Sequence, residues 1–330
     1  FWPFESTFDF NGTAFKANLN SILERNISKE PLKNELEVEQ VEKELKNSTF
    51  FLKAVESRSQ TSNPKPPFRT STLQMAAASS LGFTADRTMQ SAQKLYEGGF
   101  ITYLRTDGIS ISTSPNTGEP FSEENPGPPP LEEIRNFIRS NYAKTYLSKE
   151  TRIFKSKVQN SQEAHEAIRP TDIFKTPKDT ILNADEAKLY ELIWNRTVAS
   201  QMESSKYERK TLVISSSDGK YEFRASSRKN IFQGFEILIS ASEKEDSFFP
   251  EDLSEGMPLD MLSNSYEQKF SSPPNRYSEA SLIKKMEEEG IGRPSTYATI
   301  VKGLRTKKYA YGAKSIIPSE LGRVLTSYLK

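Results

Sequence analysis

A proline-rich run at residues 63–67, with the sequence NPKPP, most restricts how this chain can fold. Proline lacks a backbone N–H and has a fixed φ, so the run fits neither a helix interior nor a central strand. Before it, apolar and polar residues alternate over Phe4–Phe10 and predict a strand, followed by a turn at 11–13 and a return strand at Ala14–Leu19. We therefore expect a domain boundary at this run, with a β-rich domain before it.

Capped helices are predicted directly after the proline run. Thr70 or Ser71 can begin a helix that ends near residue 79, and Thr84 can begin a second helix that ends at the glycine pair 98–99. The β-branched and aromatic residues of Phe100–Leu104 predict a strand. Helix, turn, helix and strand in this order are typical of a helix-turn-helix or winged-helix unit.

The rest of the chain gives simpler signals. The segment 110–130, rich in Ser, Pro, Gly and Glu, is predicted to be a loop without a fold of its own. Further helices are expected at 33–46, 131–142, 185–203 and within 278–330, and strands at 207–215 and 220–226.

The composition excludes several kinds of chemistry. The 330 residues suggest two or three domains. The chain has no cysteine, which rules out disulfides, thiolate zinc sites, iron–sulfur clusters and a cysteine nucleophile, and one histidine, which rules out a multi-histidine metal site. Its apolar runs are far shorter than the roughly 20 residues that cross a bilayer, so we expect no membrane segment.

The net charge of +1 hides an uneven distribution. Residues 274–330 contain eleven Lys and Arg against five Glu, and 290–319 contain six basic residues and no acid. Such a segment can neutralise several phosphates, with an affinity that falls steeply with salt. A nucleic-acid-binding surface and an ordinary solvated face both fit this pattern.

Two stretches align without gaps, Leu81–Tyr103 and Glu289–Tyr311, and the alignment places Gly82 on Gly290. One hypothesis is that the chain contains two related helix-turn-helix units. The alternative is that any two capped amphipathic helices align this well.

Tyr103 differs from the other twelve tyrosines in its neighbours, because it lies in the sequence ITYLRTD at 101–107. Alternation along the expected strand puts Tyr103, Arg105 and Asp107 on one face. A phenol beside a guanidinium suits attack on a phosphodiester, since arginine binds phosphate oxygens bidentately and phenolate leaves well enough for the step to be reversed. Simple packing of Tyr103 is the structural alternative.

The only histidine, His165, is flanked by Glu163, Glu166 and Arg169. A lone histidine is commonly a hydrogen-bonded core residue. In this company it can also steady a phosphate or relay a proton.

Four segments together resemble the type IA DNA topoisomerases, of the bacterial topoisomerase I kind. They are FRTSTLQ at 68–74, RTMQ through LYEGG at 87–99 leading into ITYLRTD, AHEAIRPT at 164–171, and GIGRPSTYA at 290–298. Their order and rough spacing fit the family, and the resemblance covers nearly the whole chain.

The resemblance implies a role for each candidate residue. Tyr103 would attack a phosphate of single-stranded DNA, become linked to the 5′ phosphate and leave a 3′ hydroxyl, which reverses the attack after strand passage without ATP. Arg105 would hold the scissile phosphate and stabilise the transition state, and His165 would hydrogen-bond near it. The DNA-binding residues expected from the resemblance and the basic segment are Arg69, Arg169, Arg293, Ser295, Thr296, Lys302 and Arg305.

The family fold implied by the resemblance is an α+β multidomain toroid, in which a β-rich hinge domain carries helical domains of the helix-turn-helix or winged-helix kind. We therefore expect the hinge at 1–66 and 208–245, the helical domain with the tyrosine at 67–207, and part of a basic base domain at 246–330.

The resemblance also implies that the chain is a fragment. In the family a Toprim domain, whose acidic DxDxD cluster binds Mg²⁺, precedes the segment where this chain begins, and zinc ribbons are common at the C-terminus. These residues contain no DxDxD and open on Phe1, and Gly108 stands where the family often has Ser. We expect Mg²⁺ in the full-length enzyme, no metal bound by these residues, and little or no relaxation of supercoils by the chain alone.

The expected partners are single-stranded and negatively supercoiled DNA, bound by a monomer in the bacterial cytoplasm by default, or in an organelle. A tyrosine recombinase is disfavoured, because Tyr103 precedes His165 and Arg169 whereas the recombinase tyrosine normally follows them. The remaining alternative is a non-catalytic module that binds single-stranded nucleic acid, in which Tyr103 packs or stacks on a base.

Overall fold

The computed structural model describes residues 1–114, 128–155, 165–239, 249–250, 252–312 and 314–329. Its contacts divide the chain into two compact units. The sheet unit comprises 1–62, 205–233 and 240–274, and the helical unit comprises 63–204, 234–239 and 275–330. The proline run at 63–67 begins the first stretch of the helical unit.

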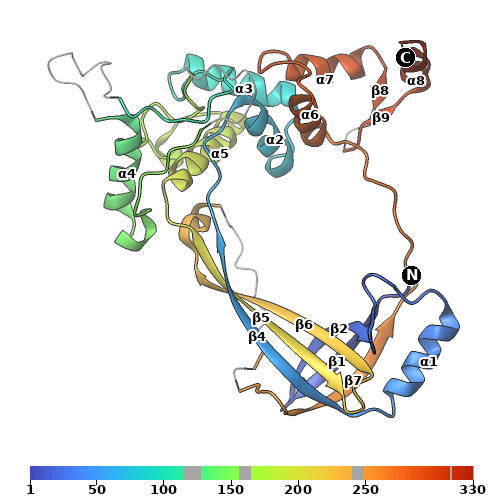
Figure 1. Ribbon diagram of the computed structural model, residues 1–330. Coiled ribbons are helices and arrows are strands. Elements are labelled where there is room, and N and C mark those ends of the chain that lie inside the picture. Colours follow the sequence, from blue (N-terminus) through green and yellow to red (C-terminus); the bar gives the residue numbers. More distant parts are fainter. Residues whose placement is uncertain (115–127, 156–164, 240–248, 251, 313, 330) are drawn as a thin grey trace. The chain divides into compact units, whose positions relative to one another are not determined.

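Antiparallel strands build the sheet unit (Figure 1). They are β1 (Phe4–Phe10), β2 (Thr13–Ile22), β3 (Arg25–Asn26), β4 (Phe50–Ser62), β5 (Ser205–Ser216), β6 (Tyr221–Phe232) and β7 (Pro258–Tyr266). Their order is β1-β7-β4-β5-β6-β2-β3, and β1 also pairs with β2, so the sheet closes on itself as a barrel. Closure gives each barrel strand a neighbour on both sides.

Aromatic side chains fill the barrel. Alternation in β1 directs Phe4 and Phe8 inward, where both are almost fully buried. The ring of Phe8 meets those of Phe50 and Phe223 edge to face, with centroids 5.3 Å apart in each pair. Such geometry adds to the stabilisation from buried area.

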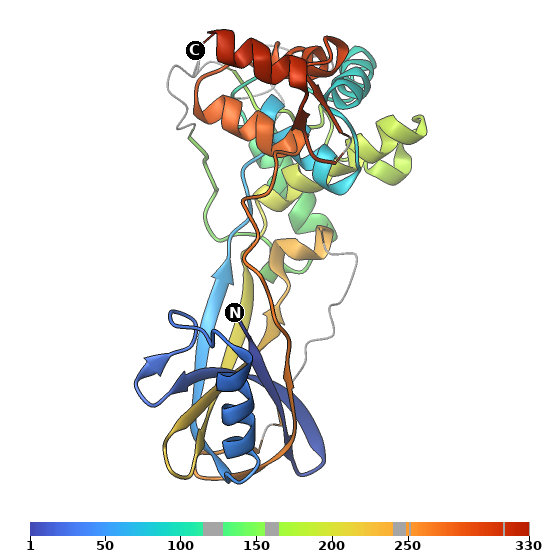
Figure 2. The ribbon, with the colours of Figure 1, turned by 90° about the vertical axis from the view of Figure 1, so that its right-hand side faces the viewer.

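Helix α1 (Glu35–Leu45) lies against the barrel (Figure 2). It packs on the core through one stripe of side chains. Val38, Val41 and Leu45 recur at helical spacing and are buried. Asn34 caps the helix, since its side-chain oxygen accepts the Glu37 N–H at 2.9 Å. The opposite side of the helix is charged and exposed, as the sequence predicts.

Three strands continue beyond the barrel. β7 pairs with β4 only at Phe50 and Phe51, and β2 pairs with β6 only as far as Arg224. The outer parts of β4, β5 and β6 therefore pair only with one another, which we call the ribbon (residues 56–62, 205–211 and 226–232). Figure 1 shows these long strands side by side. Along β4 the side chains change from buried to exposed, because the ribbon has no core of its own.

The helical unit contains α2 (Thr70–Ser80), α3 (Ala85–Glu97), α4 (Pro130–Asn141), α5 (Ala184–Ser200), α6 (Glu279–Glu288), α7 (Tyr297–Thr306) and α8 (Glu320–Leu329), with a short hairpin of β8 (Ala310–Tyr311) and β9 (Ile317–Pro318). Helix α2 packs on α6, and α3 packs on α7. Thr84 caps α3 and Ser278 caps α6, each through its side-chain oxygen. The aligned glycines Gly82 and Gly290 both turn the chain in the left-handed region, at φ of 68° and 69°. The relation between the two helix pairs stays a prediction.

Most elements occur where the sequence predicts them, with instructive exceptions. The predicted strand at Phe100–Leu104 is wrong, because only Ile101 makes an isolated bridge there. Strands β4 and β7 were not predicted, and β7 belongs to the sheet unit although its residues fall in the expected base domain at 246–330. Much of the predicted loop at 110–130, and the expected boundary at 245–246, lie outside the described residues.

Within the described ranges, no helix has both the length and the apolar character needed to cross a bilayer.

Glu44 at the end of α1 provides a test of this fold. Its carboxylate pairs with the Lys220 ammonium and accepts the Tyr221 hydroxyl at 2.6 Å, and these bonds lower its pKa from 4.5 to about 2. The ionised carboxylate therefore stabilises the folded chain above pH 4.5, and this stabilisation is lost as the pH falls toward 2. We expect Glu44→Gln to lower the free energy of unfolding at pH 7 by about 1 kcal/mol, because the pair is partly solvated.

Urea unfolding at pH 7, 4.5 and 3 measures this effect. The difference between the wild-type chain and Glu44→Gln should shrink as the pH falls, whereas Glu24→Gln, at an exposed position, should change little at any pH. A Glu44→Gln chain as stable as wild type at pH 7 would contradict the assignment.

Candidate active site

Three segments of the helical unit meet around the sequence ITYLRTD. They are residues 68–70, 101–110 and 165–171. Single backbone bridges join Phe68 to Ile168 and Ile101 to Pro170. The segment that contains His165 is thus placed beside the segment that contains Tyr103 and Arg105.

Thr102 connects the tyrosine segment to the histidine segment. Its hydroxyl donates to the Ala167 carbonyl at 2.7 Å and accepts the Arg169 N–H at 3.0 Å. Its own N–H donates to the Arg169 carbonyl at 2.9 Å. The residue directly before Tyr103 is therefore held by three hydrogen bonds.

Thr70 connects the tyrosine segment to the start of α2. Its buried hydroxyl donates to the Leu104 carbonyl at 2.7 Å and accepts the Thr106 N–H at 2.9 Å. The Thr106 hydroxyl in turn donates to the Glu166 carbonyl at 3.0 Å. These side chains satisfy backbone groups that have no strand partner, which buried polar groups require.

The expected alternation survives without a strand. Leu104 and Thr106 are buried, whereas Tyr103 is 49% exposed and Arg105 is exposed. Asp107 is only half-buried. Tyr103 and Arg105 therefore both reach solvent, because the backbone between them is pinned by the side chains that point inward.

The Tyr103 ring rests against one other aromatic ring. Tyr96, near the end of α3, meets it edge to face with centroids 5.4 Å apart, and Tyr96 is itself exposed. This contact orients the ring and leaves the phenol accessible. Among the described residues, the Tyr103 hydroxyl has no hydrogen-bond partner.

Arg105, two residues after Tyr103 in the sequence, is an exposed cation. It forms neither an ion pair nor a side-chain hydrogen bond with any residue in the described ranges. All five N–H donors of its guanidinium are thus available to an anion.

His165 is exposed, so it is not a buried core residue. Its backbone packs closely on Gly108: a Cβ atom built at position 108 would lie 2.0 Å from the His165 carbonyl oxygen. Only glycine permits this approach, which explains why this chain has no Ser at 108.

Arg169 is not a free cation. Its Nε and Nη2 bind both carboxylate oxygens of Glu166, at 2.9 and 3.0 Å, and its Nη1 donates to the Pro170 carbonyl. The side chain is only 11% exposed. A DNA contact by Arg169 would require this pair to open.

Arg69 is also paired. It forms a two-point contact with Glu287 of α6, at 3.0 and 2.6 Å, and the Ser71 hydroxyl donates to the same carboxylate at 2.6 Å. Both partners of this ion pair are largely buried. The contact ties the beginning of α2 to α6.

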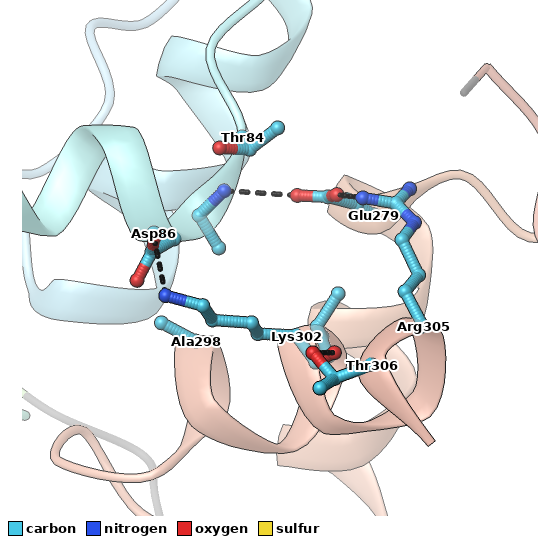
Figure 3. A pocket seen from close by; sticks show the side chains of 9 residues that line it. Thr84, Asp86, Glu279, Ala298, Lys302, Arg305 and Thr306 are labelled. Carbon is cyan, nitrogen blue, oxygen red and sulfur yellow. Dashed lines mark hydrogen bonds and ion pairs between the residues drawn. The ribbon is translucent and has the colours of Figure 1, made fainter. Parts of the chain in front are cut away.

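Lys302 and Arg305 form a third group of ion pairs, which lines a small pocket between α3 and α7 (Figure 3). Lys302 binds Asp86 at 2.9 Å, and Arg305 binds Glu279. The other oxygen of Glu279 accepts the Ala85 N–H at 2.8 Å, so a carboxylate from α6 caps the first turn of α3.

The remaining predicted DNA-binding residues lie in the exposed turn before α7. Arg293, Ser295 and Thr296 are all exposed. In the described part of the chain, the Arg293 guanidinium contacts only backbone carbonyls, including that of Gly292 at 2.7 Å. The backbone N–H of Arg293 donates to the Thr296 hydroxyl at 2.8 Å. This turn offers one cation and two hydroxyls without an acidic partner among the described residues.

Sequence reasoning missed the acids of this region, Glu279 and Glu287, and one cation, Arg196. The guanidinium of Arg196 lies 4.5 Å from the centre of the Phe68 ring, and burial lowers its pKa. The signal for the two acids was present: both lie on the helix that precedes a long stretch without any acid. Their partners could not be read from spacing.

Nowhere in the described ranges do three or more acidic or histidine side chains form a group that could hold a metal ion.

Known proteins resemble this chain over most or all of its length. Residues 1–330 match the family described as DNA topoisomerase. DNA topoisomerase 1 of Rickettsia bellii (strain RML369-C) is 42% identical, over 97% of this chain and 40% of its own length. The counterpart from Helicobacter pylori (strain ATCC 700392 / 26695) is 38% identical, over 89% of this chain and 39% of its own.

A solved structure is similar as well. Full-length topoisomerase I from Thermotoga maritima matches with a TM-score of 0.78 and 33% identity, over 100% of this chain and 51% of that one. The chain thus spans about two fifths of the length of those two curated relatives.

The contact between Gly108 and His165 gives a test of the site's construction. We expect Gly108→Ala to lower the free energy of unfolding by about 1–3 kcal/mol, because the backbone must move away from the new methyl group. Gly303→Ala is the matched control: a Cβ there meets nothing within 4 Å, and alanine favours the helix by about 0.5–1 kcal/mol. Thermal unfolding compares the two variants. A Gly108→Ala chain as stable as wild type would contradict the close approach of residue 108 to the His165 carbonyl.

Proposed function

This chain belongs to the DNA topoisomerase family, and on that premise we propose that it is the part of a type IA enzyme that supplies the nucleophile, Tyr103. The supporting observation is an accessible phenol followed, two residues on, by an exposed guanidinium that has no ion pair or hydrogen bond among the described residues. Threonine hydroxyls hold the backbone that carries both. The proposed substrate is single-stranded DNA, including strands opened by negative supercoiling. Acting on a chromosome, the protein would work in the bacterial cytoplasm, as a monomer.

The proposed reaction exchanges one phosphodiester for another. The Tyr103 oxygen bonds to the scissile phosphorus, and the bond from phosphorus to the 3′ oxygen breaks. The phenol proton leaves Tyr103, and the departing 3′ oxygen gains a proton. Because the phosphotyrosine ester conserves the energy of the broken bond, the 3′ hydroxyl can reverse the attack without ATP.

Arg105 is suited to the charge that develops during this exchange. A planar guanidinium can bind two oxygens of the scissile phosphate at once and stays protonated throughout. Preorganised donors of this kind stabilise a transition state more than a mobile side chain does. His165, exposed on the adjoining segment, is proposed to hydrogen-bond near the same phosphate.

DNA binding is proposed to begin at the exposed turn with Arg293, Ser295 and Thr296. The four other predicted cations, Arg69, Arg169, Lys302 and Arg305, are each paired with a carboxylate. Each of these four side chains can bind a phosphate only if the phosphate replaces its carboxylate partner.

We propose that Mg²⁺, which the family relationship suggests for the full enzyme, is bound outside the residues described here. No step above depends on it.

A second function is favoured by one observation. Tyr96 and Tyr103 form an exposed aromatic pair, and bases of single-stranded nucleic acid stack on such rings. A non-catalytic binding module would use this pair and nothing else of the site.

Tyr103→Phe separates the two functions. The variant should lose the covalent protein–DNA adduct entirely, since no oxygen remains to form it, while affinity for a single-stranded oligonucleotide changes by no more than about twofold. The measurement is denaturing gel electrophoresis after trapping, on the full-length protein. Tyr96→Phe, which alters the neighbouring ring alone, should still form adduct. Adduct formation by Tyr103→Phe would exclude Tyr103 as the nucleophile.

Arg105→Lys tests the role of the guanidinium. Lysine keeps the charge but not the planar fork, so we expect cleavage to slow by about 10²–10³-fold while binding weakens only a fewfold. Single-turnover cleavage and equilibrium binding give the two numbers. Arg139→Lys, at an exposed position on α4, should affect neither. Equal losses of cleavage and binding would mean that Arg105 is merely a backbone contact.

A further inference from the structure

Three arginines lie directly opposite one another across the ribbon. Arg58 of β4 pairs with Arg209 of β5, and Arg209 pairs with Arg228 of β6. Directly paired residues of antiparallel strands project from the same face, so the three guanidinium groups form one row. All three side chains are exposed.

This row works against the stability of the ribbon. Like charges directly opposite in neighbouring strands repel, whereas opposite charges attract. The next row, on the other face, shows the favourable arrangement, since Glu208 lies opposite Lys229. The arginine row therefore lowers the stability of the ribbon, although the neighbouring row of the same strands pairs opposite charges.

Among the residues that the structure describes, few contacts neutralise the row. Arg58 has one exposed contact, to Glu56 of its own strand at 3.3 Å. Arg228 stacks on the ring of Tyr207, with its central carbon 3.4 Å from the ring centre. Arg209 has no acidic partner in the part of the chain that the structure describes.

The neighbouring side chains on this face are hydrogen-bonding groups. One adjacent row contains Gln60, Tyr207 and Asn230, and the other contains Thr211 and Ser226, with Glu56 as the only acid. Amides and hydroxyls beside arginines are typical of surfaces that bind phosphate groups.

We propose that the arginine row binds the sugar–phosphate backbone of a nucleic-acid strand, without reading its sequence. Neighbouring strands are about 4.8 Å apart, so the row spans about 10 Å. A strand in helical conformation rises about 3.4 Å per phosphate along its axis, so about three phosphates fall within that length. This inference goes beyond the proposed function, because it concerns the sheet unit and involves neither Tyr103 nor Arg105.

Replacing Arg58, Arg209 and Arg228 together with Gln tests the proposal. The measurement is the fluorescence anisotropy of a labelled 30-nucleotide single strand, titrated at salt concentrations from 0.05 to 1 M. Loss of three phosphate contacts should reduce the slope of log affinity against log salt by about 2, which weakens binding about 100-fold at 0.1 M and little at 1 M. Titrations use the Tyr103→Phe background, so the result does not depend on covalent chemistry.

Two controls make the outcome specific. Substituting Gln for the exposed Lys29, Lys33 and Lys43 changes the net charge by the same amount and should leave the slope nearly unchanged. The Arg→Lys triple variant should keep the slope, since charge is what releases counterions. The Gln triple variant should melt no lower than wild type, because it relieves repulsion. The proposal would be overturned if the Arg→Gln triple kept its slope, or if the Arg→Gln and Lys→Gln triples changed it equally. It would also be overturned if the Tyr103→Phe chain with all three arginines in place did not bind the oligonucleotide.

Discussion

Threonine hydroxyls, buried or partly buried, take the place of a strand ladder, and the geometry of the candidate active site depends on them. Thr70, Thr102 and Thr106 each bond backbone groups of a different segment, so segments that touch at single bridges are also joined by side-chain hydrogen bonds. A hydroxyl both donates and accepts, which lets one side chain serve a carbonyl and an N–H together. Because the hydrogen bonds point inward, the intervening Tyr103 and Arg105 are left free for chemistry.

The cations of the helical unit fall into two groups. Arg69, Arg169, Lys302 and Arg305 are matched with carboxylates. The pairs of Arg69 and Lys302 join residues more than 200 positions apart, whereas Arg169 binds Glu166 on its own segment. Arg105 has no such partner among the described residues. The local excess of positive charge that the sequence shows is thus smaller in the folded chain. An anionic ligand meets a few selected guanidinium groups rather than a uniform field.

Motif and pattern together predict much of this molecule. The family and the mixed α+β class are confirmed, and the capped helices α2 and α3 begin and end near the expected residues. The strand at Phe100–Leu104 is wrong because β-branched residues also suit an extended segment whose partners are side chains. The sequence pattern did not predict β4, because the outer half of this strand is polar on both faces, as a ribbon without a core permits.

The site was only partly readable. Alternation placed Tyr103 and Arg105 together on the accessible side, although for a different structural reason. The pairing of Arg69 with Glu287 joins residues 218 positions apart, and no spacing rule reaches that far. The catalytic and DNA-binding roles stay predictions, since they depend on a ligand and not on the fold.

The ribbon leaves the protected surroundings of the barrel, and this has a consequence for solubility. On its two outer strands, β4 and β6, one row of N–H and C=O groups faces no neighbouring strand in the described part of the chain, which is the usual template for the addition of a foreign strand. Arginine on both of these strands makes the approach of a second, identical ribbon electrostatically unfavourable. The repulsion that weakens the ribbon internally therefore also guards the protein against self-association through its open edges.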